Sequence, residues 1–102
     1  MQVAPAEIEN HLVLHPAISD VAVIGVEDEF SGERAKAFIV RSREVMTEMG
    51  DSELKLSINK HVESHFNESY WLQGRIVFTD EIPRSQSGKV LKRVLRSFPI
   101  QQ

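Results

Sequence analysis

The chain has 102 residues, of which 41% are hydrophobic and 26% are charged, so its size and composition are those of one globular domain. It contains no cysteine, which excludes disulfide scaffolds, thiolate zinc sites and cysteine nucleophiles and is compatible with a reducing, intracellular compartment. No uncharged apolar run approaches the roughly 18 residues that a membrane-spanning helix needs, and the N-terminus lacks the basic-then-apolar order of a secretory signal.

The net charge of −3 conceals two oppositely charged parts of the chain. Residues 1–81 contain all 15 acidic residues and seven basic ones. Residues 82–102 contain no acidic residue and five basic ones: Arg84, Lys89, Lys92, Arg93 and Arg96. A basic tail on an acidic body predicts contact with an anion, and the alternative is a basic helix face that water solvates.

The first half of the chain predicts a helix followed by two strands. Pro5 suits the first turn of a helix whose apolar residues recur at helical spacing, and Pro16 ends that helix. The β-branched run 21–26 predicts a strand that is buried on both faces. A polar turn follows, and residues 34–41 predict a second strand that pairs with the first as a hairpin.

The second half of the chain predicts a helix, a strand and a further helix. We expect Asp51 or Ser52 to cap a helix over residues 52–66. Residues 75–80 predict a third strand, and after a loop rich in Pro, Ser and Gly an amphipathic helix covers residues 90–98. The predicted fold class is therefore α+β, a small central sheet of about three strands with helices packed on it in the order α-β-β-α-β-α.

The four histidines form two pairs with a spacing of four residues, His11 with His15 and His61 with His65. Such a spacing can place two imidazoles on one metal ion. The zinc-protease pattern, however, requires a glutamate directly after the first histidine, and no third ligand is evident near either pair. We therefore interpret these histidines as structural or surface residues and predict no metal site.

The tripeptide Ser87-Gly88-Lys89 ends like a phosphate-binding loop but departs from the Walker pattern. Pro83 stands where that pattern requires a glycine, and Val90 follows the lysine in place of a magnesium-binding Ser or Thr. The loop still offers a glycine that lets a ligand approach the backbone, and an ammonium suited to phosphate or carboxylate oxygens. The alternative is a helix start with a solvated lysine.

Four stretches, taken together and in order, resemble the C-terminal domain of the adenylate-forming enzymes, which include acyl-CoA synthetases, 4-coumarate-CoA ligases and the adenylation domains of peptide synthetases. These stretches are residues 2–9, 15–26, 32–40 and 82–93. The first looks like the segment after the family's hinge, and its sequence Gln2-Val3-Ala4-Pro5-Ala6-Glu7 favours the CoA-ligase branch. The last looks like the catalytic-lysine motif, Ile82-Pro83-Arg84-Ser85-Gln86-Ser87-Gly88-Lys89.

The resemblance implies a two-step reaction between which this small domain rotates. A carboxylate attacks the α-phosphate of ATP to give an acyl-adenylate and pyrophosphate, and the thiol of CoA then displaces AMP; Mg²⁺ is expected in the full-length enzyme. Lys89 matches the family's adenylation lysine, and Gln2 matches a glutamine that supports chemistry near the hinge. The remaining residues expected at the nucleotide are Ser87, Gly88 and Arg84.

The resemblance also implies that residues 1–102 are the mobile C-terminal domain of an acid–thiol ligase, inactive alone because the large N-terminal domain is absent. Its expected partners are that large domain, a carboxylic acid and CoA, with neither nucleic acid nor a membrane span. Trp71 and Arg84 stand where the family often has lysine. Two other functions stay open, namely part of a peptide-synthetase adenylation domain, with a carrier-protein thiol as acceptor, and a non-catalytic anion-binding module.

Overall fold

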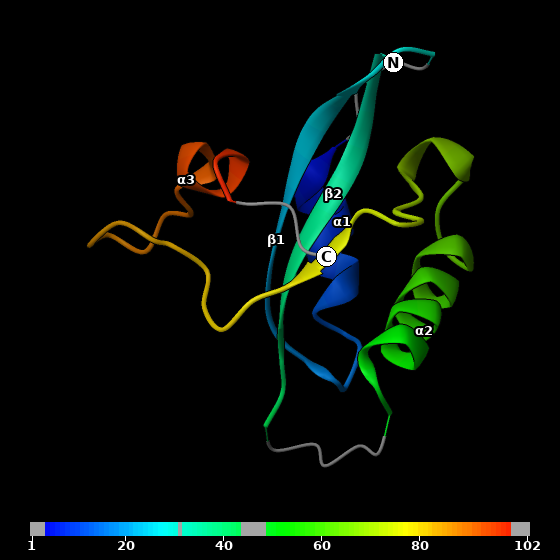
Figure 1. Cartoon of the computed structure of the whole chain (residues 1–102), viewed down its shortest axis with the longest axis horizontal. Coiled ribbons are helices and arrows are strands. Elements are labelled where there is room, and N and C mark those ends of the chain that lie inside the picture. Colours follow the sequence, from blue (N-terminus) through cyan, green and yellow to red (C-terminus); the bar gives the residue numbers. More distant parts are fainter. Residues whose placement is uncertain (1–3, 31, 44–48, 99–102) are drawn as a thin grey trace.

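The structure, a computed structural model, describes residues 4–30, 32–43 and 49–98. Its elements in chain order are α1 (Pro5–Leu12), β1 (Ile18–Asp28), β2 (Gly32–Arg41), α2 (Asp51–Glu63), a 3₁₀ turn (Glu68–Tyr70), β3 (Ile76–Phe78) and α3 (Lys92–Arg96) (Figure 1). This order and the three-stranded mixed sheet confirm the predicted α+β class. None of the helices in this part of the chain has the length and apolar character needed to cross a membrane.

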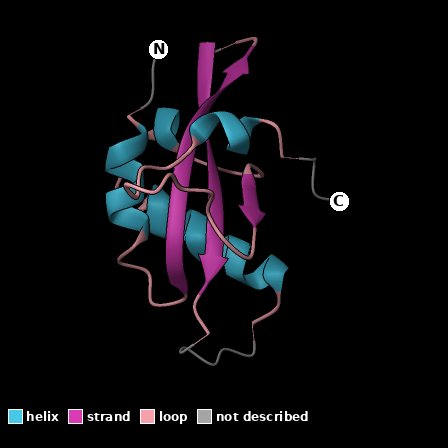
Figure 2. Ribbon diagram, turned by 90° about the vertical axis from the view of Figure 1, so that its left-hand side faces the viewer, coloured by secondary structure: helices cyan, strands magenta, loops and turns pink. Residues whose placement is uncertain are grey.

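The sheet has the strand order β1-β2-β3, which makes β2 the central strand. The predicted hairpin is confirmed, because β1 and β2 pair in antiparallel fashion with Val21 opposite Ile39. Strand β3 runs parallel to β2, with Val77 opposite Phe38, and a parallel pair needs a crossover connection, which contains α2. Figure 2 shows the two long strands of the hairpin beside the short third strand.

Two apolar clusters cover the two faces of the sheet, and they explain the unbroken apolar run of β1, because alternate residues of a strand point to opposite faces. Val21 and Val23 belong to the cluster that includes α1 and α2, through Ile8, Leu12, Leu54, Ile58 and Val62. Ala22 and Ile24 belong to the other cluster, with Phe38, Val77, Ile82 and Leu95. Accordingly, α2 and α3 lie on opposite sides of the hairpin (Figure 1).

Helix α2 ends earlier than predicted and begins differently. It covers Asp51–Glu63 instead of residues 52–66, and Gly50 takes the N-cap position without a side-chain cap hydrogen bond. The expectation that Asp51 or Ser52 caps this helix is therefore wrong. The carboxylate of Asp51 instead accepts a hydrogen bond from Nη1 of Arg41 at 2.6 Å, an ion pair that joins β2 to α2.

The helix predicted over residues 90–98 is reduced to the five residues of α3. The backbone N–H of Leu91 donates to the carbonyl oxygen of Pro83 at 2.9 Å, so the residues before α3 are held in a turn rather than a helix. Arg96 is exposed, as its place on the basic face predicts, but its Nη1 also donates to the carbonyl oxygen of Gly25 at 2.7 Å. This bond ties α3 to strand β1.

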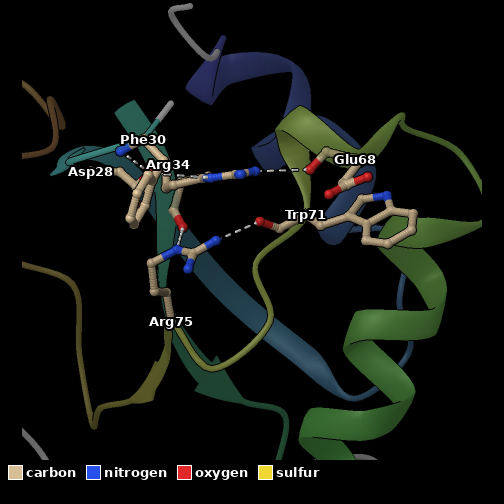
Figure 3. A network of polar contacts seen from close by, with 7 residues as sticks. Asp28, Phe30, Arg34, Glu68, Trp71 and Arg75 are labelled. Carbon is tan, nitrogen blue, oxygen red and sulfur yellow. Dashed lines mark hydrogen bonds and ion pairs between the residues drawn. The ribbon is translucent and has the colours of Figure 1, made fainter. Parts of the chain in front are cut away.

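Two arginines fasten the irregular segment between α2 and β3 to strand β2 (Figure 3). Nη1 of Arg34 donates to the carbonyl oxygen of Glu68 at 3.2 Å. Arg75 donates from Nε to the carbonyl of Ala35 and from Nη2 to the carbonyl of Trp71, both at 2.9 Å. Trp71 is half-buried against the main core, so the aromatic residue that replaces a charge in the resembled pattern packs as part of the fold.

Candidate functional site

The predicted lysine loop is a closed turn. Arg84 and Val90 form an antiparallel bridge at its base. Across the turn, the N–H of Ser85 donates to the carbonyl of Lys89 at 2.8 Å, and the N–H of Gly88 donates to the carbonyl of Ser85 at 2.9 Å. The side chain of Lys89 therefore extends from a backbone whose conformation is fixed by the hydrogen bonds of its own turn.

Gly88 is required by the conformation of this turn rather than by lack of space. Its φ is +90°, a region that residues with a Cβ rarely adopt. Among the described residues other than Gly88 and its two chain neighbours, no heavy atom lies within 4 Å of the position that a Cβ would take, so the neighbourhood is open. That open space is compatible with the predicted approach of a ligand to the backbone at this point.

The side chains of the turn differ in the polar contacts that they form. The hydroxyl oxygens of Ser85 and Ser87 lie 2.9 Å apart, and Oγ of Ser85 also accepts the N–H of Lys89 at 3.3 Å. Ser87 and Lys89 are exposed. Within the part of the chain that the structure describes, the ammonium of Lys89 forms neither a hydrogen bond nor an ion pair. It is a cation available to an external anion.

A groove of about 570 Å³ adjoins this lysine. It is lined by Glu9 of α1 and by residues 89–94. Leu91 and Val94 line it and are 38% and 37% exposed, which is high for large apolar side chains. A molecule in the groove would therefore meet the basic side chains of Lys89, Lys92 and Arg93 beside a largely apolar wall.

Glu9, which lines the groove, also contacts strand β1, where acidic side chains accept backbone N–H groups that no strand among the described residues pairs. Oε2 of Glu9 accepts the N–H of Val23 at 2.7 Å, and Oδ1 of Asp20 accepts the N–H of Val21 at 2.9 Å. Edge strands of natural sheets are commonly protected in such ways. Figure 1 shows α3 beside β1 on the side away from β2, with the lysine turn projecting outward, and Arg84 at the base of that turn contacts Asp20 of β1.

Two predicted site residues remain, Arg84 and Gln2, and the structure describes only Arg84. Arg84 donates from Nη1 to the carbonyl of Gly88 at 3.0 Å and from Nη2 to Oδ1 of Asp20 at 2.8 Å. Gln2 lies outside the described residues. Asp20 was not recognised as a site neighbour from sequence, because 64 positions separate it from Arg84 and no local pattern links them.

The two histidine pairs form one cluster between α1 and α2. The ring of His11 stacks on those of His61 and His65, with centroid distances of 4.0 and 4.2 Å. Nε2 of His11 lies 2.9 Å from the carbonyl of His61, and Nε2 of His61 lies 2.8 Å from the carbonyl of His11. Across residues 4–30, 32–43 and 49–98, no group of three or more His, Cys, Asp or Glu side chains could hold a metal ion. The histidines join two helices.

Comparison with known proteins identifies one matching family and several enzymes. The pattern of the family described as the AMP-binding enzyme C-terminal domain matches residues 7–89. Acyl-CoA ligase cm3C of Cordyceps militaris is 55% identical over 96 residues, which cover 94% of this chain and 15% of that protein. Acyl-CoA ligase easD of Emericella nidulans is 52% identical over 96 residues, which cover 94% of this chain and 17% of that protein.

A plant enzyme and two solved structures extend the likeness. The 4-coumarate–CoA ligase 1 of Arabidopsis thaliana is 38% identical over 96 residues, covering 94% of this chain and 16% of that enzyme. The Mycobacterium tuberculosis fatty acyl CoA synthetase matches with a TM-score of 0.74 and 34% identity, over 94% of this chain and 18% of that one. The anthranilate CoA ligase AuaEII, solved with anthranoyl-AMP, matches with a TM-score of 0.78 and 30% identity, over 95% and 18%.

Proposed function

Because the chain belongs to the AMP-binding enzyme C-terminal domain family, we propose that it is the mobile, lysine-bearing domain of an ATP-dependent acyl-CoA or aryl-CoA ligase. The names of its relatives, acyl-CoA ligases and a 4-coumarate–CoA ligase, support CoA rather than a carrier protein as the acceptor. The chain spans 15% to 17% of the length of those relatives. The rest of the protein would therefore supply the acid pocket and most of the nucleotide site.

In the proposed reaction a carboxylate oxygen attacks the α-phosphate of ATP, so that an acyl-adenylate forms and pyrophosphate leaves. Negative charge gathers on the oxygens between the carboxylate and the phosphate as this bond forms. The ammonium of Lys89 would approach these oxygens and stabilise the transition state more than the ground state, which is the condition for acceleration. The thiol of CoA then displaces AMP after the domain has rotated, a step that does not use Lys89.

The remaining predicted residues and the metal enter the proposal more narrowly. The exposed hydroxyl of Ser87 and the open backbone at Gly88 are proposed to lie beside the nucleotide. Gln2 is proposed to support the same chemistry from the hinge side. The described residues offer no carboxylate cage for Mg²⁺. We therefore assign the ion to the phosphates of ATP and to other parts of the protein, where it would offset phosphate charge.

The observation that carries this proposal is the unpaired, exposed ammonium on a turn of fixed conformation beside an apolar groove. A different observation argues against a general anion-binding surface. Two of the five basic residues of the tail, Arg84 and Arg96, already contact the protein's own strand β1. Lys89, Lys92 and Arg93 therefore remain for the broad basic patch that nucleic acid or an acidic membrane would require.

The test is Lys89→Ala in the full-length enzyme, with the two half-reactions measured separately. Acyl-adenylate formation, followed by pyrophosphate exchange into ATP, should slow by about 10²- to 10³-fold, as for the loss of one preorganised donor. Transfer of a preformed acyl-adenylate to CoA should continue near its normal rate. Lys60→Ala, which removes an ammonium from α2, is the matched control and should change neither rate. Unchanged pyrophosphate exchange in Lys89→Ala would refute the role of this lysine.

A further inference from the structure

We propose that Arg84 and Asp20 form a clamp that positions Lys89 for the adenylation step, so that Arg84 is a positioning residue and not a nucleotide ligand. This inference rests on the proposed function of Lys89. It starts from the two contacts of one guanidinium, because Arg84 reaches the lysine turn with one nitrogen and strand β1 with the other.

The contacts form a continuous chain from the sheet to the lysine. The carboxylate of Asp20 is oriented by the backbone of β1, since its Oδ1 accepts the N–H of Val21 at 2.9 Å. The same oxygen accepts Nη2 of Arg84 at 2.8 Å. Nη1 of Arg84 donates to the carbonyl of Gly88 at 3.0 Å, and the next residue is Lys89.

The clamp supplies an orientation that the other contacts of the turn do not fix. The backbone hydrogen bonds of residues 83–91 given above run within that segment, so they set its internal shape but not its angle to the sheet. Val90 packs half-buried against the second apolar cluster, a contact that is not directional. The planar fork of an arginine does impose direction, because its donors have a fixed geometry.

The expected consequence is kinetic and not a large loss of stability. The side chains of Arg84 and Asp20 are 38% and 37% exposed, and ion pairs that water reaches to this extent contribute little to folding. A catalytic group displaced by about 1 Å, in contrast, can lose up to about 10²-fold in rate. A pair that is weak in folding free energy can therefore still matter for the reaction.

The experiment uses the full-length enzyme with Arg84→Gln, Asp20→Ala and both changes together. Each single variant should lower the maximal rate of pyrophosphate exchange by about tenfold, with the KM for ATP, the melting temperature and CoA transfer from a preformed adenylate unchanged. The double variant should be no slower than either single one, because both changes break the same link. Arg84→Lys should recover part of the rate, since an ammonium can still reach one partner.

The matched control is another ion pair at the border of the sheet, Arg41 with Asp51, which lies at 2.6 Å and joins β2 to α2. Arg41→Gln and Asp51→Asn should leave pyrophosphate exchange unchanged. A raised KM for ATP in Arg84→Gln, with Asp20→Ala like the unaltered enzyme, would overturn the clamp and make Arg84 a nucleotide ligand. Normal rates in both variants, with Lys89→Ala slow, would overturn the clamp alone. A normal rate in Lys89→Ala would overturn the proposed function and the clamp with it.

Discussion

At the scale of single residues, there are two different reasons why position 88 requires a glycine. Sequence reasoning explained it by the approach of a ligand to the backbone. The structure adds a second cause, a φ of +90° that closes the turn and directs the chain into Lys89. Any residue with a Cβ is disfavoured at such a φ, whether or not a ligand is present.

Gly88→Ala in the full-length enzyme should therefore slow adenylate formation by about tenfold, because strain of about 1–2 kcal/mol opens the turn and displaces the lysine. Gly74→Ala is the matched control. A Cβ added at Gly74 would likewise meet no described residue within 4 Å other than its two chain neighbours, but the φ of Gly74 is not positive. Pyrophosphate exchange measures both variants, and equal rates in the two would show that the conformation of Gly88 is not required.

At the scale of elements, the contact between α1 and α2 contains all four histidines. Nδ1 of His15 accepts the N–H of Ala17 at 3.1 Å, and Nε2 lies 2.9 Å from Oγ of Ser57. One nitrogen that accepts and one that is free to donate describe a neutral imidazole. Burial lowers the pKa of His15 below its ordinary value of 6.5, and the neighbouring ring of His61, 5.5 Å away by centroid and nearly perpendicular, lowers it further.

A lowered pKa in the folded state means that the unfolded chain binds protons more tightly. The contribution of His15 to stability is therefore complete above about pH 6.5, the unfolded value, and is lost as the pH falls below it. The free energy of unfolding, measured with urea at about pH 7.5 and about pH 5.5, should be lower at the acid value. His15→Gln should weaken this dependence. Equal pH dependence with and without His15 would contradict the assignment.

The elements that sequence predicted well are those fixed by local pattern. The apolar run of β1 and the polar turn before β2 are contiguous, so the hairpin could be inferred from them. The lengths of α2 and α3 depend on distant partners, since Arg41 contacts the start of α2 and Pro83 accepts the N–H of Leu91. The same division holds for the site. The motif around Lys89 is local, whereas the contact between Arg84 and Asp20 and the joining of the histidine pairs arise only from the fold.

At the scale of the whole molecule, different elements pack on the two faces of the sheet. Helices α1 and α2 pack on one face and build the main core, and the half-buried and exposed histidines contact one another beside it. The lysine turn and α3 are attached to the other face through Leu95 and Ile82, and the bond from Arg96 to β1 ties α3 to that strand. Lys89, the groove and the exposed side chains of Leu91 and Val94 therefore lie together, where another part of a larger protein could meet them.

The most direct test of the central claim is the accessibility of the Lys89 amine in the full-length enzyme. The amines are acetylated briefly with acetic anhydride and quantified by peptide mass spectrometry, with and without α,β-methylene-ATP plus the acid that the enzyme activates. If Lys89 reaches the reacting oxygens, these ligands should protect it strongly, while Lys60 on α2 should be labelled equally in both conditions. Undiminished labelling of Lys89 with the ligands bound would contradict the claim.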